Sequence, residues 1–232
     1  MPGTLKFSAA AFAWRMAESN KSMIGGNRML FFFLPKRNRL LKQLIKGFPK
    51  EYTEDVKAVF HVLAGASEAY NGAFYSGETT EWELLSGEKI EILYRVYLRD
   101  KLSSLNQLTP QQQLIYHCIL SRSDDGYVRQ KHIEALLDAT APEWAMPYII
   151  KVCDEYVYEI LETVYRSLKN RNCEPYKALC RQNFAYFRLG HCHMISYWSE
   201  YHRHKCYRYK NYLGKNLYAE CFGYRKTGQK SI

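Results

Sequence analysis

The sequence has no apolar run long enough to cross a membrane. The longest near the amino terminus, residues 29–34, has six residues, whereas a membrane-spanning helix needs about 20. The apolar stretch at residues 8–14 is too short for a secretory signal, and Arg15 interrupts it without a cleavage site. We therefore expect an intracellular, cytoplasmic protein with no membrane partner.

The sequence also lacks the signatures of a disulfide framework and of phosphate chemistry. Its seven cysteines are odd in number and no two form a Cys-x-x-Cys pair, so we expect most of them to be reduced and buried. Gly25 and Gly26 are not followed by Lys-Ser or Lys-Thr, as a phosphate-binding loop requires. Catalytic and cofactor-binding motifs are missing too, which favours a protein without enzymatic activity.

The acidic residues do not form a catalytic pattern either. Asp124 and Asp125 precede a helical pattern, and we interpret them as helix caps. Glu155, Glu159 and Glu162 recur at helical spacing on one side of a predicted helix. We interpret these three glutamates as a solvated face rather than as a general acid and base.

The composition is that of a folded globular protein with a basic end. The chain has 232 residues, of which 47% are hydrophobic and 24% charged, which suits one domain. We expect residues 1–28 to form a poorly ordered extension and residues 29–232 a single helical domain. The net charge of +10 arises in residues 166–232, where 14 lysines and arginines face three acidic residues. Such an asymmetry suggests an anionic partner.

Apolar periodicity predicts a mainly helical fold with one small β-hairpin. A helical pattern around Leu40 stops at Gly47, and a second helix is predicted to begin with Thr53 as its cap. Apolar and polar residues then alternate near residues 81–99, which predicts a hairpin whose second strand runs from 90 to 99.

Helical spacing continues through the second half of the chain. Thr109 and Pro110 are typical of a helix start. A helix that Pro175 opens is predicted to stop at Gly190, and a further helix to start at Met194.

Two similar segments lie 29 positions apart in this helical half. Residues 125–137 begin Asp-Gly-Tyr-Val, and residues 154–168 begin Asp-Glu-Tyr-Val. In each, an acidic residue that can cap a helix precedes apolar residues at helical spacing. Over about residues 111–168, these segments resemble the helices of HEAT-type repeats. The resemblance implies stacked antiparallel helix pairs, a short α-solenoid, with Val128 and Val157 facing inward.

The resemblance also implies classes of function. Helical arrays of this type usually act as binding scaffolds through a concave face. Some bind damaged DNA in a basic groove and excise alkylated bases, and others are small immunity or adaptor proteins.

A cluster of histidines and cysteines lies near the basic end. These residue types bind zinc, but His191 and His193 are two positions apart and would face different ways on a helix. Basic neighbours would also repel a metal. We predict no metal site, and the residues that a site would use are His191, His193, His202, His204 and Cys206.

The basic, aromatic stretch from Trp198 onward is the strongest candidate for function. A row of cations suits an anionic partner. Tyrosine and arginine are also favoured at protein interfaces. We predict non-catalytic binding of an acidic protein partner. The alternative is nucleic-acid binding, including glycosylase-like DNA repair, because unpaired bases stack on aromatic rings. The predicted binding residues are Trp198, Tyr201, Arg203, Lys205, Tyr207, Arg208, Tyr209 and Lys210.

Overall fold

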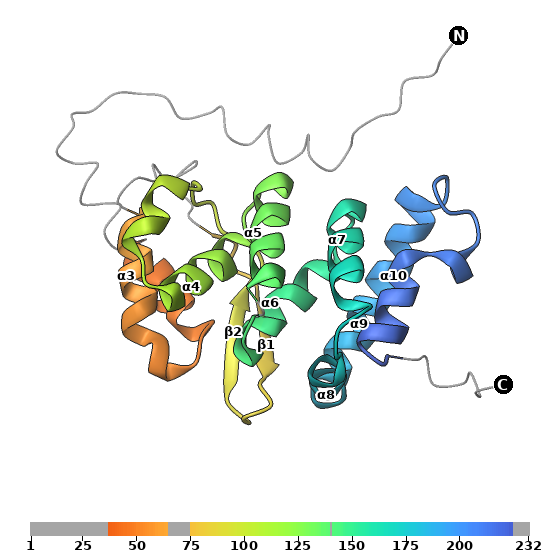
Figure 1. Cartoon of the computed structure of the whole chain (residues 1–232), viewed down its shortest axis with the longest axis horizontal. Coiled ribbons are helices and arrows are strands. Elements are labelled where there is room, and N and C mark those ends of the chain that lie inside the picture. Colours follow the sequence, from red (N-terminus) through yellow and green to blue (C-terminus); the bar gives the residue numbers. More distant parts are fainter. Residues whose placement is uncertain (1–36, 65–74, 140, 225–232) are drawn as a thin grey trace, which may run out of the picture.

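The structure, a computed structural model, describes residues 37–64, 75–139 and 141–224 (Figure 1). There the chain is mainly helical with one small antiparallel sheet, as the sequence predicts. The predicted extension 1–28 lies outside the described residues. Residues 37–46 are helical. The helices that follow are α3 (Thr53–Ala64), α4 (Pro110–Leu120), α5 (Gly126–Asp138), α6 (Met146–Lys151), α7 (Tyr158–Leu168), α8 (Glu174–Gln182), α9 (Phe184–Tyr197) and α10 (Leu213–Asn216).

Most helices follow one another along the long axis of the molecule (Figure 1). Helix α3 packs on α4, α4 on α5 and α5 on α7, while α9 and α10 form the other end. One cluster of buried apolar side chains runs through these elements. Within the described ranges, no helix has both the length and the apolar character needed to cross a membrane. Membership of the HEAT class stays a prediction, because this packing order does not define that class.

The hairpin consists of β1 (Thr79–Glu83) and β2 (Lys89–Leu93). Trp82 lies opposite Ile90 in the antiparallel register, and its ring packs on Tyr186 of α9 at a centroid distance of 4.2 Å. The second strand ends at Leu93, earlier than the predicted end at residue 99. Beyond Leu93 the pairing with the first strand continues only as isolated contacts, because the Val96 amide donates to the carbonyl of Arg122 at 2.8 Å and Val96 forms single bridges with Tyr75 and Ser123.

The helix starts show which caps the sequence predicts correctly. Thr109 caps α4 in a reciprocal arrangement with Gln112, and Asp125 accepts from the first amides of α5, so both predictions are confirmed. The acidic residue of the second similar segment, Asp154, does not cap α7, which begins at Tyr158 with Val157 in the cap position. The two segments therefore enter their helices in different registers, although both valines pack partly buried against the core.

Helix α9 continues past Gly190, where the sequence predicts that a helix ends. Gly190 is buried inside the helix, and the predicted start at Met194 is a position in its last turns. The helix that Pro175 opens, α8, instead ends at Gln182. Gly190 allows a close approach: a Cβ built there would lie 2.7 Å from the hydroxyl oxygen of Tyr218.

We expect Gly190→Ala to lower the free energy of unfolding by about 1–3 kcal/mol, because the new methyl group overlaps a fully buried tyrosine. Tyr218→Phe in the same chain removes the clashing oxygen and should restore part of the loss. Urea denaturation monitored by circular dichroism measures both. Gly77→Ala, where a Cβ meets nothing within 4 Å, is the control. If Gly190→Ala instead raises the free energy of unfolding, the contact between residue 190 and Tyr218 is not tight.

Candidate recognition surface

Glu155 is the centre of a buried network of charges and not part of a solvated face. Its side chain is 3% exposed, so that part of the predicted acidic face is wrong. Oε1 lies 2.9 Å from guanidinium nitrogens of both Arg95 and Arg122, and Oε2 lies 3.1 Å from Nε of Arg129. The prediction failed because Glu155 lies before α7 begins, in the segment that joins it to α6, where helical spacing does not apply.

A second buried pair lies beside this network. The Lys151 ammonium is 3.1 Å from Oδ2 of Asp154, and the hydroxyl of Tyr186 donates to the same oxygen at 2.9 Å. Both charged side chains are buried. We call Arg95, Arg122, Arg129, Lys151, Asp154 and Glu155 the buried ion cluster.

The arginines of the buried ion cluster also hold loop backbone in place. Arg122 donates to the carbonyls of Leu93 and Tyr94, and Arg129 donates to those of Ser123 and Asp124. Because these carbonyls lie at the end of β2 and in the turn after α4, the cluster fixes the hairpin against the helix pair α4–α5.

The charges determine the protonation states within the cluster. Burial opposes ionisation of Glu155, but Arg122, Arg95 and Arg129 outweigh it and hold the pKa of its carboxyl below the usual value. Burial lowers the pKa of Arg129 and of Lys151, against the attraction of Glu155 and Asp154 respectively. Glu155 is therefore ionised at neutral pH, and the arginines compete for its two oxygens.

The ring of Tyr94 lies against two cations of the buried ion cluster, Arg95 and Lys151. Arg95 lies over the ring of Tyr94 at 4.4 Å from its centroid. Burial raises the pKa of Tyr197, and the charges of Tyr94, Asp154 and Glu155 add to the rise. The rings of Tyr156, Tyr197 and Tyr201 are about 6 Å apart in each pair. Tyr94, Tyr156 and Tyr201 are exposed. We call Tyr94, Tyr156, Tyr197 and Tyr201 the tyrosine cluster.

The predicted cations lie on the surface beyond Tyr201. Arg203, Lys205, Arg208 and Lys210 are all exposed, and we call them the cationic strip. Lys205 pairs with Glu159 at 3.5 Å, and Arg203 lies over the ring of Tyr207 at 5.4 Å. Among the described residues, Arg208 and Lys210 make no ion pair within 4 Å. The strip is thus largely unneutralised.

The predicted aromatic residues divide into two groups. Tyr201 and Tyr207 are exposed, with Tyr207 at 74%. Trp198 and Tyr209 instead pack on each other at 5.1 Å, and the Trp198 indole donates to the carbonyl of Cys206 at 2.8 Å. The second pair therefore supports the fold of this surface, and the first pair is available to a partner.

The predicted metal-binding residue types do not come together. His202 is buried, and its Nε2 lies 2.8 Å from the carbonyl of Tyr156. His191 Nε2 lies 3.3 Å from the hydroxyl of Tyr209, while His193 and His204 are exposed. In the part of the chain that the structure describes, no three side chains of metal-binding type form a group.

Histidines do meet elsewhere, between α4 and α5. Nδ1 of His117 lies 2.7 Å from Nδ1 of His132, and Nε2 of His132 lies 3.4 Å from Oδ2 of Asp100. Tyr116 and Lys131 also donate to Asp100. Burial is the main reason that the pKa of His132 falls to about 4. Both imidazoles are therefore neutral at pH 7, with one Nδ1 donating to the other.

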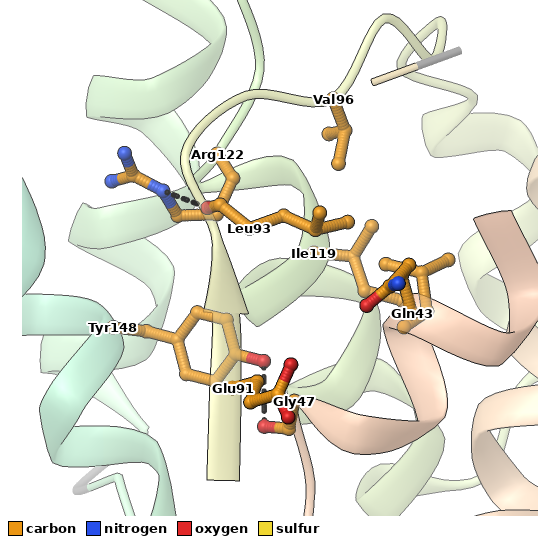
Figure 2. Close-up of a pocket in the computed structure, with 9 residues that line it drawn as sticks. Gln43, Gly47, Glu91, Leu93, Val96, Ile119, Arg122 and Tyr148 are labelled. Atoms are coloured by element: carbon orange, nitrogen blue, oxygen red, sulfur yellow. Dashed lines mark hydrogen bonds between the residues drawn. The ribbon is translucent and has the colours of Figure 1, made fainter. Parts of the chain in front are cut away.

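The described residues line a small cavity and a larger open groove. A cavity beside Tyr148 and Gly47 has about 10 Å³, room for one water. Figure 2 shows Arg122 at its edge, bonded to Leu93, with the rest of the guanidinium directed away from the cavity. An open groove of about 540 Å³ lies between the starts of α5 and α7, beside the exposed ring of Tyr127. The cavity beside Tyr148 is too small for a substrate. The groove beside Tyr127 is an open part of the molecular surface.

Comparison with known proteins does not place the chain in a family. No protein-family model, no curated protein and no solved structure matches it. What the structure defines is a mainly helical protein with a small antiparallel sheet.

Sequence reasoning missed the buried ion cluster and most of the tyrosine cluster. A signal was present: Arg129 and His132 lie at positions of α5 that the helical pattern places beside Ile133 and Leu136, on the buried side. A charged residue at such a position is rarely buried without a partner. The helical pattern of α5 is enough to indicate a buried charge at Arg129. It does not indicate that Glu155 is the partner of that charge.

Proposed function

We propose that this protein is a non-catalytic recognition module that binds an acidic protein segment. The tyrosine cluster and the cationic strip form the binding surface. The observation that carries the proposal is the exposure of tyrosine rings beside cations that the chain leaves largely unneutralised. Tyrosine and arginine are enriched among the residues that contribute most to protein interfaces.

The arrangement of the rings favours a peptide over nucleic acid. Bases stack on a free, flat aromatic face. In the tyrosine cluster the rings are inclined to one another by 38° to 67°. They therefore do not form one flat platform, which suits the side chains of a protein partner better than stacked bases.

Selection of short random peptides by the purified protein tests this function. We expect the selected peptides to be rich in aspartate and glutamate. Changing Arg203, Lys205, Arg208 and Lys210 together to glutamate should reduce their binding by at least about tenfold, because attraction becomes repulsion along the strip.

The matched control changes Arg39, Lys42, Lys50 and Lys169 to glutamate. These are exposed cations outside the candidate surface, so the total charge change is the same and binding should fall far less. Oligo(dT) and oligo(U) are tested in parallel. Selected peptides without acidic residues would contradict the proposal. So would retention of oligonucleotides at about 50 mM salt with steep loss by about 200 mM, which would support the nucleic-acid alternative.

A further inference from the structure

The buried ion cluster contains more positive than negative charge. Its four cations face two carboxylates, those of Asp154 and Glu155. Both carboxylates attract the charge of Arg95 and that of Lys151. Within the described residues the cluster therefore has a formal surplus of two positive charges.

This surplus is buried and incompletely bonded. Nη1 of Arg122 is buried and has no hydrogen-bond partner among the described residues, and the side chain of Arg122 is 1% exposed. Removing an ion from water costs several kcal/mol unless an opposite charge compensates it. An additional anion close to the cluster would reduce that cost.

The cluster meets the surface at Arg95. Its side chain is 11% exposed, against 1% to 7% for the other members. Arg95 uses Nη1 for both Glu155 and the Tyr94 carbonyl. Tyr94 covers it on one side, and the same ring lies 5.4 Å from the Lys151 ammonium. Tyr94 thus borders the reachable edge of the surplus charge.

We propose that Arg95 is the anchor point for one carboxylate side chain of the acidic partner segment. The aspartate or glutamate lies beside Tyr94, whose hydroxyl group also donates to it. Apolar atoms of the neighbouring partner residues pack on Tyr156 and Tyr201. This inference rests on the proposed function, since it names where the partner's charge binds on that surface.

A double-mutant cycle with a selected acidic peptide tests the anchor. Each acidic residue of the peptide is changed in turn to its amide, against the wild-type protein and against Arg95→Gln. For one position we expect each single change to weaken binding about 10- to 100-fold, and the two together to cost little more than either. Arg39→Gln, an exposed arginine at the far end of the molecule, should leave binding unchanged.

Crosslinking keeps the test valid if Arg95→Gln fails to fold. Peptides carrying a photoreactive phenylalanine beside the anchor residue are irradiated with the wild-type protein, and crosslinks should form at Tyr94, Tyr156, Tyr197 or Tyr201. Crosslinks confined to other regions would overturn the anchor. Loss of binding in the cationic-strip variant together with full binding to Arg95→Gln would also overturn it, while leaving the proposed function intact. Selection of no acidic peptide would overturn both.

Discussion

Glu155→Gln should lower the free energy of unfolding by about 3–5 kcal/mol, the largest effect that we expect from one substitution. The glutamine keeps the shape of the side chain but removes the charge that three arginines share. Breaking a buried ion pair on one side leaves the other ions uncompensated in the interior. Here four cations would remain with the single carboxylate of Asp154. Urea denaturation at pH 7 measures the loss.

Glu159→Gln is the matched control for this substitution. Glu159 is an exposed glutamate on the first turn of the next helix and pairs with Lys205 at 3.5 Å. Exposed pairs contribute about 0–1 kcal/mol, so we expect little change. A Glu155→Gln protein as stable as the control would show that the buried ion cluster does not hold the hairpin against the helices.

Acidification should destabilise the protein through the pair His117–His132. The pKa of His132 is about 4 in the folded protein, chiefly because of burial, whereas an unfolded histidine has a pKa of about 6.5. Between these values the unfolded chain binds a proton that the folded chain does not. Stability contributed by the neutral imidazole is therefore present above about pH 6.5 and is lost as the pH falls towards 4. The full loss is about 3 kcal/mol.

Urea denaturation between pH 7 and 5 measures the contribution of the buried histidines, because most carboxylates stay ionised there. Burial also lowers the pKa of His202, which adds to the loss in the same direction. We expect a loss of about 2 kcal/mol over that interval. The pKa of His117 is lowered by burial too, which acts in the same direction, while Asp100, whose pKa lies below its usual value, keeps its charge. His193→Gln, which changes an exposed histidine, should leave the pH dependence unchanged. A flat stability profile over this interval would contradict the account.

The sequence predicts local structure where short-range chemistry decides it. The caps Thr109 and Asp125 follow from hydrogen bonds between near neighbours. The hairpin follows from alternation, but not its length, because Val96 pairs with the backbone of Arg122 from a distant segment. Gly190 shows the same limit: a glycine that suggests a helix end is needed for the close approach of Tyr218.

The candidate surface could be predicted only in part, for a related reason. The excess of cations near the carboxyl end is visible from composition, and the four residues of the cationic strip are exposed as predicted. The tyrosine cluster combines Tyr94 just after β2, Tyr156 from the segment before α7, Tyr197 at the end of α9 and Tyr201 from the π-helical turn that follows. Such a combination depends on tertiary packing. The same is true of Glu155, whose partners lie up to 60 residues away in the chain.

Nuclear magnetic resonance of the side chains during titration with a selected acidic peptide tests the central claim most directly. The account predicts saturable shifts in the ring signals of the tyrosine cluster and in the guanidinium signals of Arg95, with the signals of Arg39 unchanged. Shifts that appear only in Arg39 and other cations outside this surface would contradict it.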